Sequence, residues 1–352
     1  MFDLAIRNGT LVTADRVFGG HLYVRNGTIA AISDDGTLPA REELDAAGLY
    51  VLPGMLDCHA HINDPGFTWR EDLPHASEAA AVGGVTTLID MPLQNTPPLT
   101  SAAAFANKRA VFEGRSLVDY AFWGGLVTDN TAELAGMDEA GAVGFKAFIA
   151  PVSLGYSSVD MGLAREALFR IKGFGGLAGF HCEDHALICA GEAKAKAVGG
   201  TRRAFLDSRP VVAELIATAN VIELARETGA RVHICHVSHP RVAELVRRAR
   251  AEGLPVTGET CPHYLVFTEE NLLSGGTAFK CAPPLRTAEA RDGLWEYVLD
   301  GTLSCIGSDH SPARTDEKDE AIHGVMGAWG GLSGLQSLVQ VMFDQAVTRR
   351  GC

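Results

Sequence analysis

The chain contains one stretch that decides its fold, Tyr50-Val51-Leu52-Pro53-Gly54-Met55-Leu56-Asp57-Cys58-His59-Ala60-His61, in which an apolar run ends in two histidines. Side chains two residues apart on an extended strand point to the same side, so His59 and His61 project together. Two imidazoles at that spacing can bind one divalent metal ion. By themselves, the two histidines are equally compatible with polar residues that merely end a strand.

Four later apolar runs also carry a side chain that binds metal or can be converted to a ligand: Lys146 lies within one, and His181, His236 and Asp309 end the others. Runs of strand length occur at residues 50–58, 84–91, 117–126, 142–149, 176–181, 231–237, 255–260 and 303–309. Segments with helical spacing separate most of them, such as Glu78 to Val82, Val211 to Glu227 and Arg241 to Ala251, and a last helix is expected from Leu332 to Val347.

This alternation predicts an α/β protein in which residues 51–352 form a (β/α)8 barrel, also called a TIM barrel. Active sites of such barrels lie at the C-terminal ends of the parallel strands. All six residues named above fall at or near those ends, so we expect them to gather in one site. Their separate positions in the sequence are hard to explain by accident.

Residues 1–50 have a different pattern and are expected to form a small β module. Asn8-Gly9 and Asn26-Gly27 each lie between alternating apolar runs. An Asn-Gly pair in that setting is a strong signal for a β-hairpin. The sequence therefore predicts two hairpin turns before the barrel begins.

Composition restricts the class of partner. The net charge is -13 and the isoelectric point is near 5.4, which disfavours binding to nucleic acid or to an anionic membrane. The chain has no long uncharged apolar run, and its first residues lack the features of a signal peptide. We expect a cytoplasmic protein that acts on a small molecule.

The eight cysteines include no Cys-x-x-Cys pair and are interpreted as reduced, buried thiols. Cys58, Cys182 and Cys235 each neighbour a candidate ligand and are expected to face away from it, towards the helices. Four further histidines near strand ends are expected to have supporting or structural roles: His185, His239, His263 and His310.

Lys146 is the unusual member of the candidate site. Histidines and carboxylates suit zinc and related divalent ions, whereas an ammonium group would be repelled by them. One interpretation is a lysine that is neutral or extends away from the metals. The other is a lysine carboxylated by carbon dioxide, which converts a cation into a bridging carboxylate. Spacing alone does not choose between them.

Several sequence motifs of the chain resemble those of a known enzyme family. The chain resembles the cyclic amidohydrolases of the amidohydrolase superfamily, which comprise dihydroorotases, hydantoinases or dihydropyrimidinases, and allantoinases. The motifs that carry the resemblance span nearly the whole chain: Pro53-Gly54-Met55-Leu56-Asp57-Cys58-His59-Ala60-His61, Gly83-Gly84-Val85-Thr86-Thr87, Gly144-Phe145-Lys146, Cys235-His236-Val237-Ser238, Glu259-Thr260-Cys261-Pro262-His263-Tyr264, Lys280-Cys281-Ala282-Pro283-Pro284-Leu285-Arg286 and Gly307-Ser308-Asp309-His310-Ser311-Pro312.

The resemblance implies a role for each of the six residues. His59 and His61 would bind one metal, His181 and His236 the second, and carboxylated Lys146 would bridge the two. Asp309 would bind the first metal and act as the catalytic base. The implied cofactors are two divalent ions, with zinc expected and cobalt, manganese or nickel as alternatives.

The resemblance also implies a small β-sandwich at residues 1–50, whose usual C-terminal strands are missing because nothing follows Cys352 in this sequence. It further implies a homo-oligomer, either a tetramer or a dimer. Both are expectations from the family and not from the residues themselves.

The ring that is opened depends on finer features. Dihydroorotases use an Arg and an Asn to hold the substrate carboxylate, and this chain has Asn63 and Leu93 at those positions. Hydantoinases place a Tyr where this chain has Pro151. The segments Trp123-Gly124-Gly125-Leu126-Val127 and Ala328-Trp329-Gly330-Gly331-Leu332 resemble allantoinases.

The expected reaction is therefore hydrolysis of (S)-allantoin to allantoate in purine breakdown. Asn63, Ala282 and Gly330 are the expected contacts to this cyclic ureide. A hydantoinase or dihydropyrimidinase is the alternative, followed by a dihydroorotase-like enzyme and by a non-catalytic relative.

Overall fold

The structure is a computed structural model that describes residues 1–152 and 155–352, which divide into two compact units, Met1–Met55 and Leu56–Cys352. The predicted strand at residues 50–58 is two strands, one in each unit: β5 (Tyr50–Val51) and β6 (Met55–Ala60). Leu52-Pro53-Gly54 separates them, and proline cannot donate the backbone hydrogen bond that a continuous strand would need. The first unit therefore ends about five residues later than expected.

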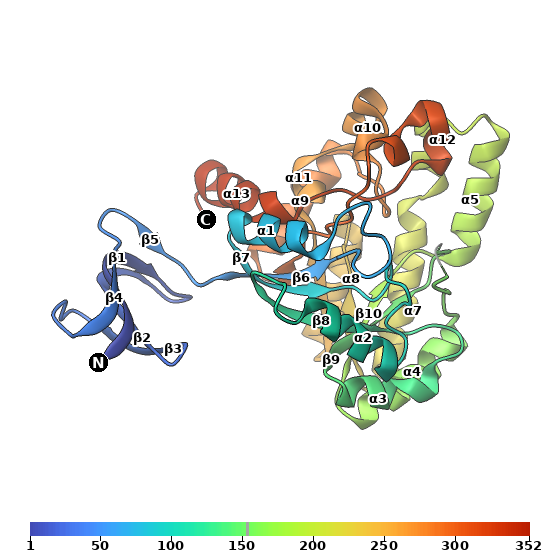
Figure 1. Ribbon diagram of the computed structural model, residues 1–352. Coiled ribbons are helices and arrows are strands. Elements are labelled where there is room, and N and C mark those ends of the chain that lie inside the picture. Colours follow the sequence, from blue (N-terminus) through green and yellow to red (C-terminus); the bar gives the residue numbers. More distant parts are fainter. Residues whose placement is uncertain (153–154) are drawn as a thin grey trace. The chain divides into compact units, whose positions relative to one another are not determined.

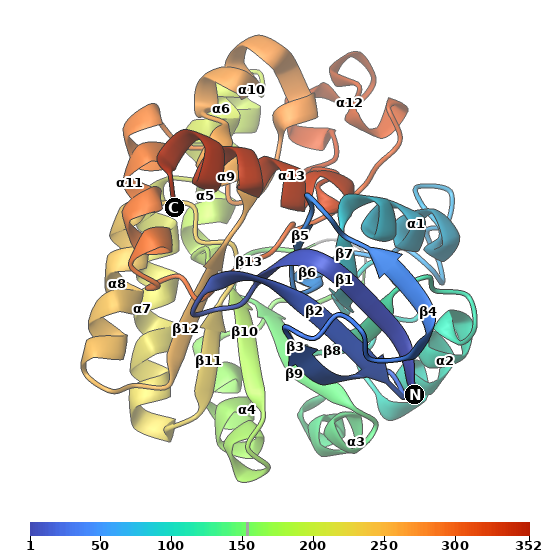
Figure 2. The ribbon, with the colours of Figure 1, turned by 90° about the vertical axis from the view of Figure 1, so that its left-hand side faces the viewer.

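The first unit contains one five-stranded sheet (Figure 2). β1 pairs with β2 in an antiparallel manner and with β4 and β5 in a parallel manner, and β2 pairs with β3. The strand order is β3-β2-β1-β4, with β5 also on β1. The other strands of this sheet are β1 (Phe2–Val12), β2 (Val17–Arg25), β3 (Thr28–Ser33) and β4 (Ala40–Asp45).

One of the two predicted hairpin turns is confirmed. Asn26 and Gly27 have positive φ angles of 52° and 72° and connect β2 to β3, as a two-residue hairpin requires. The prediction at Asn8-Gly9 is wrong, because β1 continues through both residues. Asn8 has a φ of 60° at a register shift against β2, which is a β-bulge. A side chain at Gly9 would lie 2.7 Å from Val51, so packing against β5 requires glycine there.

The second unit is the predicted barrel of eight parallel strands (Figure 1). The strands follow chain order from β6 to β13, and a bridge between Ala60 and His310 closes the ring. The His61 N–H supports the closure by donating to the His310 carbonyl at 2.8 Å. After β6, the barrel strands are β7 (Val85–Asp90), β8 (Asp119–Gly125), β9 (Ala142–Phe148), β10 (Leu177–His181), β11 (Arg231–Ile234), β12 (Val256–Thr260) and β13 (Cys305–Ile306).

Helices follow the strands and pack around them, and the apolar core lies largely between the two layers. None of the helices among the described residues is long and apolar enough to cross a bilayer. The α-helices are α1 (Leu73–Gly83), α2 (Ala102–Phe112), α3 (Leu134–Glu139), α4 (Met161–Gly173), α5 (His185–Ala197), α6 (Arg202–Ser208), α7 (Val211–Thr228), α8 (Pro240–Ala251), α9 (Pro262–Val266), α10 (Glu269–Gly275), α11 (Ala288–Leu299), α12 (Glu320–Gly327) and α13 (Leu338–Met342).

The predicted last helix is shorter than expected at its start. Leu332 forms a β-bridge with His310, so the chain is still extended there and the helical segment begins at Leu335. Its first turn is a 3₁₀-helix (Leu335–Ser337), followed by α13 and by a π-helix (Phe343–Thr348). The other three predicted helical segments are confirmed within α1, α7 and α8.

Candidate active site

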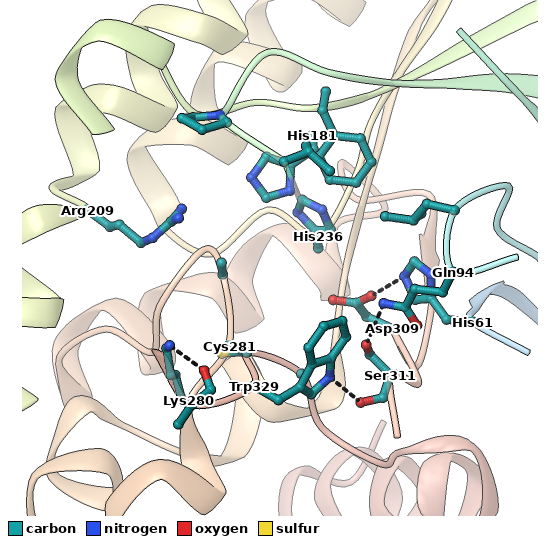
Figure 3. A pocket seen from close by; sticks show the side chains of 18 of the residues that line it. His61, Gln94, His181, Arg209, His236, Lys280, Cys281, Asp309, Ser311 and Trp329 are labelled. Atoms are coloured by element: carbon teal, nitrogen blue, oxygen red, sulfur yellow. Dashed lines mark hydrogen bonds and ion pairs between the residues drawn. The ribbon is translucent and has the colours of Figure 1, made fainter. Parts of the chain in front are cut away.

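A cavity of about 470 Å³ opens at the C-terminal ends of the barrel strands. The structure brings all six predicted residues into its lining. Figure 3 labels four of them, His61, His181, His236 and Asp309. The strands β6, β9 and β10 supply three of the six directly, and the segments that follow β6, β11 and β13 supply the rest. The six residues are His59, His61, Lys146, His181, His236 and Asp309.

One half of the site is organised around Asp309. Its Oδ1 atom lies 3.2 Å from the Nε2 atom of His59 and 3.2 Å from the Nε2 atom of His61. Two ligand atoms bound tetrahedrally to one zinc ion at ordinary bond lengths are separated by about 3.4 Å. These three side chains therefore fit a single divalent ion with little rearrangement.

The other half contains His181 and His236, whose ring centroids are 4.6 Å apart with the planes 70° from parallel. The Nε2 atom of His181 is paired with Glu183 at 2.7 Å, which leaves Nδ1 for a metal. His236 has a φ of 39°, and Asp309 has a φ of 46°. Non-glycine residues rarely adopt such angles, and strained backbone of this kind concentrates at functional sites. Both turns aim the side chain into the cavity as its strand ends.

Lys146 lies on β9, lines the same cavity as both halves and is fully buried. Its Nζ atom has no hydrogen-bond partner among the described residues and lies 5.2 Å from the centre of the Phe148 ring. A buried ammonium group without a partner is costly. The surroundings therefore suit a modified or metal-bound lysine better than an unmodified one.

Electrostatics keep most of the imidazoles neutral, which is the form that binds metal. Burial lowers the pKa of His61 to about 4 and also lowers the pKa values of His181 and His236. Burial opposes protonation of His59 too, but the Glu259 and Asp309 carboxylates together outweigh it and raise the pKa of His59 to about 10. A carboxylate in that position equally favours an imidazole that carries a metal ion.

Comparison with known proteins agrees with this geometry. The model of the dihydro-orotase-like family matches residues 48–241. The allantoinase of Escherichia coli (strain K12) is 40% identical over 357 residues, which cover 99% of this chain and 78% of that protein. The chain is a cyclic amidohydrolase.

Solved structures of related enzymes support the same assignment. The L-hydantoinase (dihydropyrimidinase) from Arthrobacter aurescens matches this amidohydrolase with a TM-score of 0.96 and 35% identity, covering 100% of this chain and 78% of that one. The dihydropyrimidinase from Brevibacillus agri NCHU1002 matches with a TM-score of 0.91 and 29% identity, at 100% and 78% coverage. The predicted barrel and the predicted family are both confirmed.

Glu259 contacts two of the candidate ligands of the amidohydrolase and was not among the predicted site residues. Its Oε1 atom accepts a hydrogen bond from the Nδ1 atom of His59 and a second, at 3.2 Å, from the His236 N–H. Glu259 is fully buried and ends the predicted strand 255–260, as the candidate ligands end theirs. Its position in the sequence was therefore the signal that could have found it.

Two of the four histidines expected to have supporting roles, His310 and His239, have partners outside the six residues. A ring nitrogen of His263 instead lies within 4.8 Å of an Asp309 carboxylate oxygen, and its Nε2 atom has no hydrogen-bond partner among the described residues. His310 pairs with Glu71 through Nε2 at 2.7 Å, and its Nδ1 atom accepts from the N–H groups of Gly334 and Leu335. His239 caps the start of α8. His310 therefore holds the segment between β13 and the last helix in place.

Two of the three cysteines expected to face the helices do not. Cys58 lies 3.2 Å from Glu259, and Cys235 lies close to His59 and Glu259. A side chain at Gly307 on the neighbouring segment would lie 2.7 Å from the Cβ atom of His59 and 3.1 Å from Oε2 of Glu259, so glycine leaves room for the contact between these two residues. The prediction for Cys58 and Cys235 is wrong, because both thiols approach Glu259.

The substrate side of the cavity is lined by neutral groups and by cations that already have partners. Arg209 is paired with Glu183 and Glu192, and Lys280 donates to the carbonyl oxygens of Met326 and Ala328. Among the described residues that line this side, neither cation is left free for a substrate carboxylate.

Two of the three predicted substrate contacts lie in the cavity lining, Ala282 and Gly330. Asn63 is fully buried and is not among the described residues that line the cavity. Gln94, which was not predicted, does line it. Its amide nitrogen donates to Ser311 at 3.3 Å, and its buried Oε1 atom has no partner among the described residues.

Proposed function

We propose that this amidohydrolase hydrolyses (S)-allantoin to allantoate, as a step of purine breakdown in the cytoplasm. The observation that carries the proposal is the substrate side of the cavity, where Arg209 and Lys280 are already paired and Gln94 offers a free acceptor. Allantoin is neutral and carries a ureido arm with several N–H donors. The likeness to the allantoinase of Escherichia coli supports the same substrate.

The six lining residues are proposed to hold two divalent ions, with zinc the expected metal. His59, His61 and Asp309 would hold one ion, and His181 and His236 the other. Bound there, the two ions would lower the pKa of a shared water and polarise the ring carbonyl.

Asp309 is proposed as the base. Its carboxylate faces the position between His59 and His61, and the histidine ring of His59 lowers its pKa against the effect of burial. It is therefore ionised and ready to accept a proton from the attacking water. The same oxygen can return that proton to the ring nitrogen that leaves. The products are a carboxylate and an opened ring.

Lys146 is proposed to be carboxylated on Nζ. Carbamate formation joins the lysine nitrogen to the carbon of carbon dioxide and releases the displaced proton to solvent. The product is an anion with two oxygen ligands, placed between the two halves of the site. It replaces a buried cation that has no partner among the described residues with a group that can bridge two metals.

Hydrolysis of a hydantoin or a dihydropyrimidine is the second candidate. The observation that favours it is the match to the L-hydantoinase from Arthrobacter aurescens, which has a TM-score of 0.96. Both candidates require the same metal site, so only the substrate distinguishes them.

The test compares substrates on enzyme that contains two metal ions per chain. We expect kcat/KM for allantoin to exceed that for dihydroorotate at least about a hundredfold, because burying a carboxylate without a partner costs several kcal/mol. Comparable values, or a preference for 5-substituted hydantoins or dihydrouracil, would overturn the allantoinase assignment and leave the metal site intact.

A variant sharpens this test. Gln94→Met keeps the size of the side chain but removes the free acceptor, so kcat/KM for allantoin should fall about tenfold, the value of one hydrogen bond. Dihydrouracil has no ureido arm and serves as the matched control, and its residual hydrolysis should not change. Equal losses on both substrates would show that Gln94 shapes the cavity without recognising the arm.

A further inference from the structure

A second cluster of metal-binding side chains lies in the barrel outside the cavity. It consists of Cys58 on β6, His233 on β11, Glu259 on β12 and Cys305 on β13. His233 precedes His236 by three residues, and Cys305 precedes Asp309 by four, so the cluster lies nearer the amino ends of the strands. None of the four belongs to the described lining of the cavity.

Three of these side chains, Cys58, Glu259 and Cys305, converge on one point, and His233 contacts the carboxylate among them. The two thiol sulfurs are 3.6 Å apart, and the Cys58 sulfur is 3.2 Å from Oε2 of Glu259. The ligand atoms of Cys58, Glu259 and Cys305 all lie within 4.8 Å of one another. Nε2 of His233 lies 3.4 Å from the same Glu259 oxygen.

These separations match a tetrahedral site for a soft divalent ion. At ordinary zinc bond lengths, two thiolate ligands are about 3.8 Å apart, and a thiolate and a carboxylate oxygen are about 3.6 Å apart. The observed separations would need to widen by only a few tenths of an ångström. Two sulfurs and one oxygen form a ligand set that zinc and cadmium accept, and water can supply a fourth ligand.

His233 supports the carboxylate of the cluster. Its Nδ1 atom lies 2.8 Å from the Thr257 hydroxyl, and its Nε2 atom lies 3.4 Å from Oε2 of Glu259. A side chain that contacts a metal ligand in this way helps to orient it.

Glu259 can serve both sites because its two oxygens face different partners. Oε1 accepts from His59, whereas Oε2 faces Cys58 and His233. An ion in the cluster would use only Oε2. Cys58 and Cys305 are partly exposed, which gives an ion access to them.

We propose that Cys58, Glu259 and Cys305, with His233 supporting the Glu259 carboxylate, form a third metal site, separate from the cavity and selective for a soft divalent cation such as Zn²⁺ or Cd²⁺. As the ion binds, each thiol releases its proton to solvent and forms a metal–sulfur bond. No electron transfer is involved. The two thiolates distinguish this site from the six nitrogen and oxygen ligands proposed for the cavity.

The experiment uses enzyme loaded with two zinc ions per chain, kept reduced with a phosphine, and titrated with CdCl₂. Thiolate-to-cadmium charge transfer gives an ultraviolet band that nitrogen and oxygen ligands do not produce, so the band reports on the cluster whether or not the cavity is active. We expect the band to saturate at one cadmium per chain while the zinc content stays constant. Failure of the band to form, or displacement of zinc without a band, would overturn the proposal.

Variants test which residues bind the cadmium ion that produces the band. Cys305→Ser should abolish it, and His233→Gln should weaken cadmium affinity about tenfold or more. Cys189→Ser is the matched control, because Cys189 is an exposed thiol on α5 and its loss should leave the band unchanged. A band that survives in Cys305→Ser would place the ion elsewhere.

A measurement on the unmodified chain covers the case in which Cys305→Ser does not fold. Cadmium at one equivalent should protect two thiols from alkylation, and mass spectrometry should identify them as Cys58 and Cys305. Unchanged alkylation of both thiols would overturn the proposal without any variant.

Discussion

Two buried lysines in the same barrel have opposite surroundings. Lys108 on α2 and Lys146 on β9 are both fully buried. Lys146 has no hydrogen-bond partner among the described residues, whereas Lys108 has a complete set. The Lys108 ammonium donates to the Ile62 carbonyl at 2.9 Å, to the Asp64 carbonyl at 2.6 Å and to the Asn95 side chain at 2.6 Å, and pairs with Asp90 at 2.8 Å.

The difference separates a structural lysine from a functional one. Lys108 ties the segment after β6 to the segment after β7, so its partners are all supplied by the chain itself. Burial lowers the pKa of Lys108 and raises that of Asp90, but each stabilises the charge of the other. A lysine buried at equal depth without such partners indicates that its partner comes from outside the chain.

The largest expected effect is the loss of Lys146. Lys146→Ala removes the proposed bridge between the metals, so kcat/KM should fall at least about 10⁴-fold, which corresponds to about 5.5 kcal/mol. Short carboxylic acids such as acetate should restore part of the activity by replacing the bridge. Lys194→Ala changes an exposed lysine on α5 and should keep full activity. A bare ammonium at Lys146 in a fully metallated crystal would contradict the proposed carboxylation.

The second effect concerns the aspartate of the same region. Asp309→Asn removes the proposed base but keeps an oxygen near His59 and His61, so turnover should fall about a thousandfold, in the range expected for general acid–base catalysis. Metal analysis should still find ions held by the histidines. Turnover close to that of the unmodified enzyme would assign the base to another group.

The sequence alone was sufficient to predict which residues gather at the C-terminal ends of the barrel strands. Apolar runs mark parallel strands, and a barrel brings the carboxyl end of every strand to one rim, so the order of residues alone places His59, His181 and Asp309 together. The sequence was not sufficient to predict the surroundings of a side chain that is buried by segments distant in the chain. Lys108 lies in an Ala-rich helix and has the sequence character of an exposed lysine, because its burial depends on loops that follow two different strands.

Local signals failed where tertiary packing overrides them. Asn8-Gly9 has the composition of a hairpin turn, but β4 and β5 both pair with β1 and keep it extended to Val12. Alternation along β6 predicted that Cys58 faces away from His59. The alternation does not include contacts with another strand, here between the Cys58 thiol and the Glu259 carboxylate on β12.

The third effect tests the structural lysine and is an effect on stability. Lys108→Met leaves Asp90 buried without its ionic partner, which should lower the free energy of unfolding by about 3–5 kcal/mol. The double variant Lys108→Met/Asp90→Leu removes both charges and should recover part of that loss. Urea unfolding monitored by circular dichroism measures the free energy of unfolding of the single and the double variant. A loss below about 1 kcal/mol in the single variant would show that the two buried lysines differ less than their contacts indicate.

The smallest effect concerns Glu259, which gives His59 the kind of fixed partner that Lys146 lacks. Glu259→Gln keeps the shape of the side chain but replaces a carboxylate with a neutral amide, so the imidazole of His59 becomes a weaker metal ligand. We expect zinc affinity, measured by competition with a chelator, to fall about 10–100-fold. Because the variant acts through His59 and leaves Asp309 in place, kcat should return towards its original value when zinc is in excess. A merely structural role would instead lower the free energy of unfolding and leave zinc affinity unchanged. Exposed Glu296 on α11 provides the matched control, since Glu296→Gln should alter neither quantity.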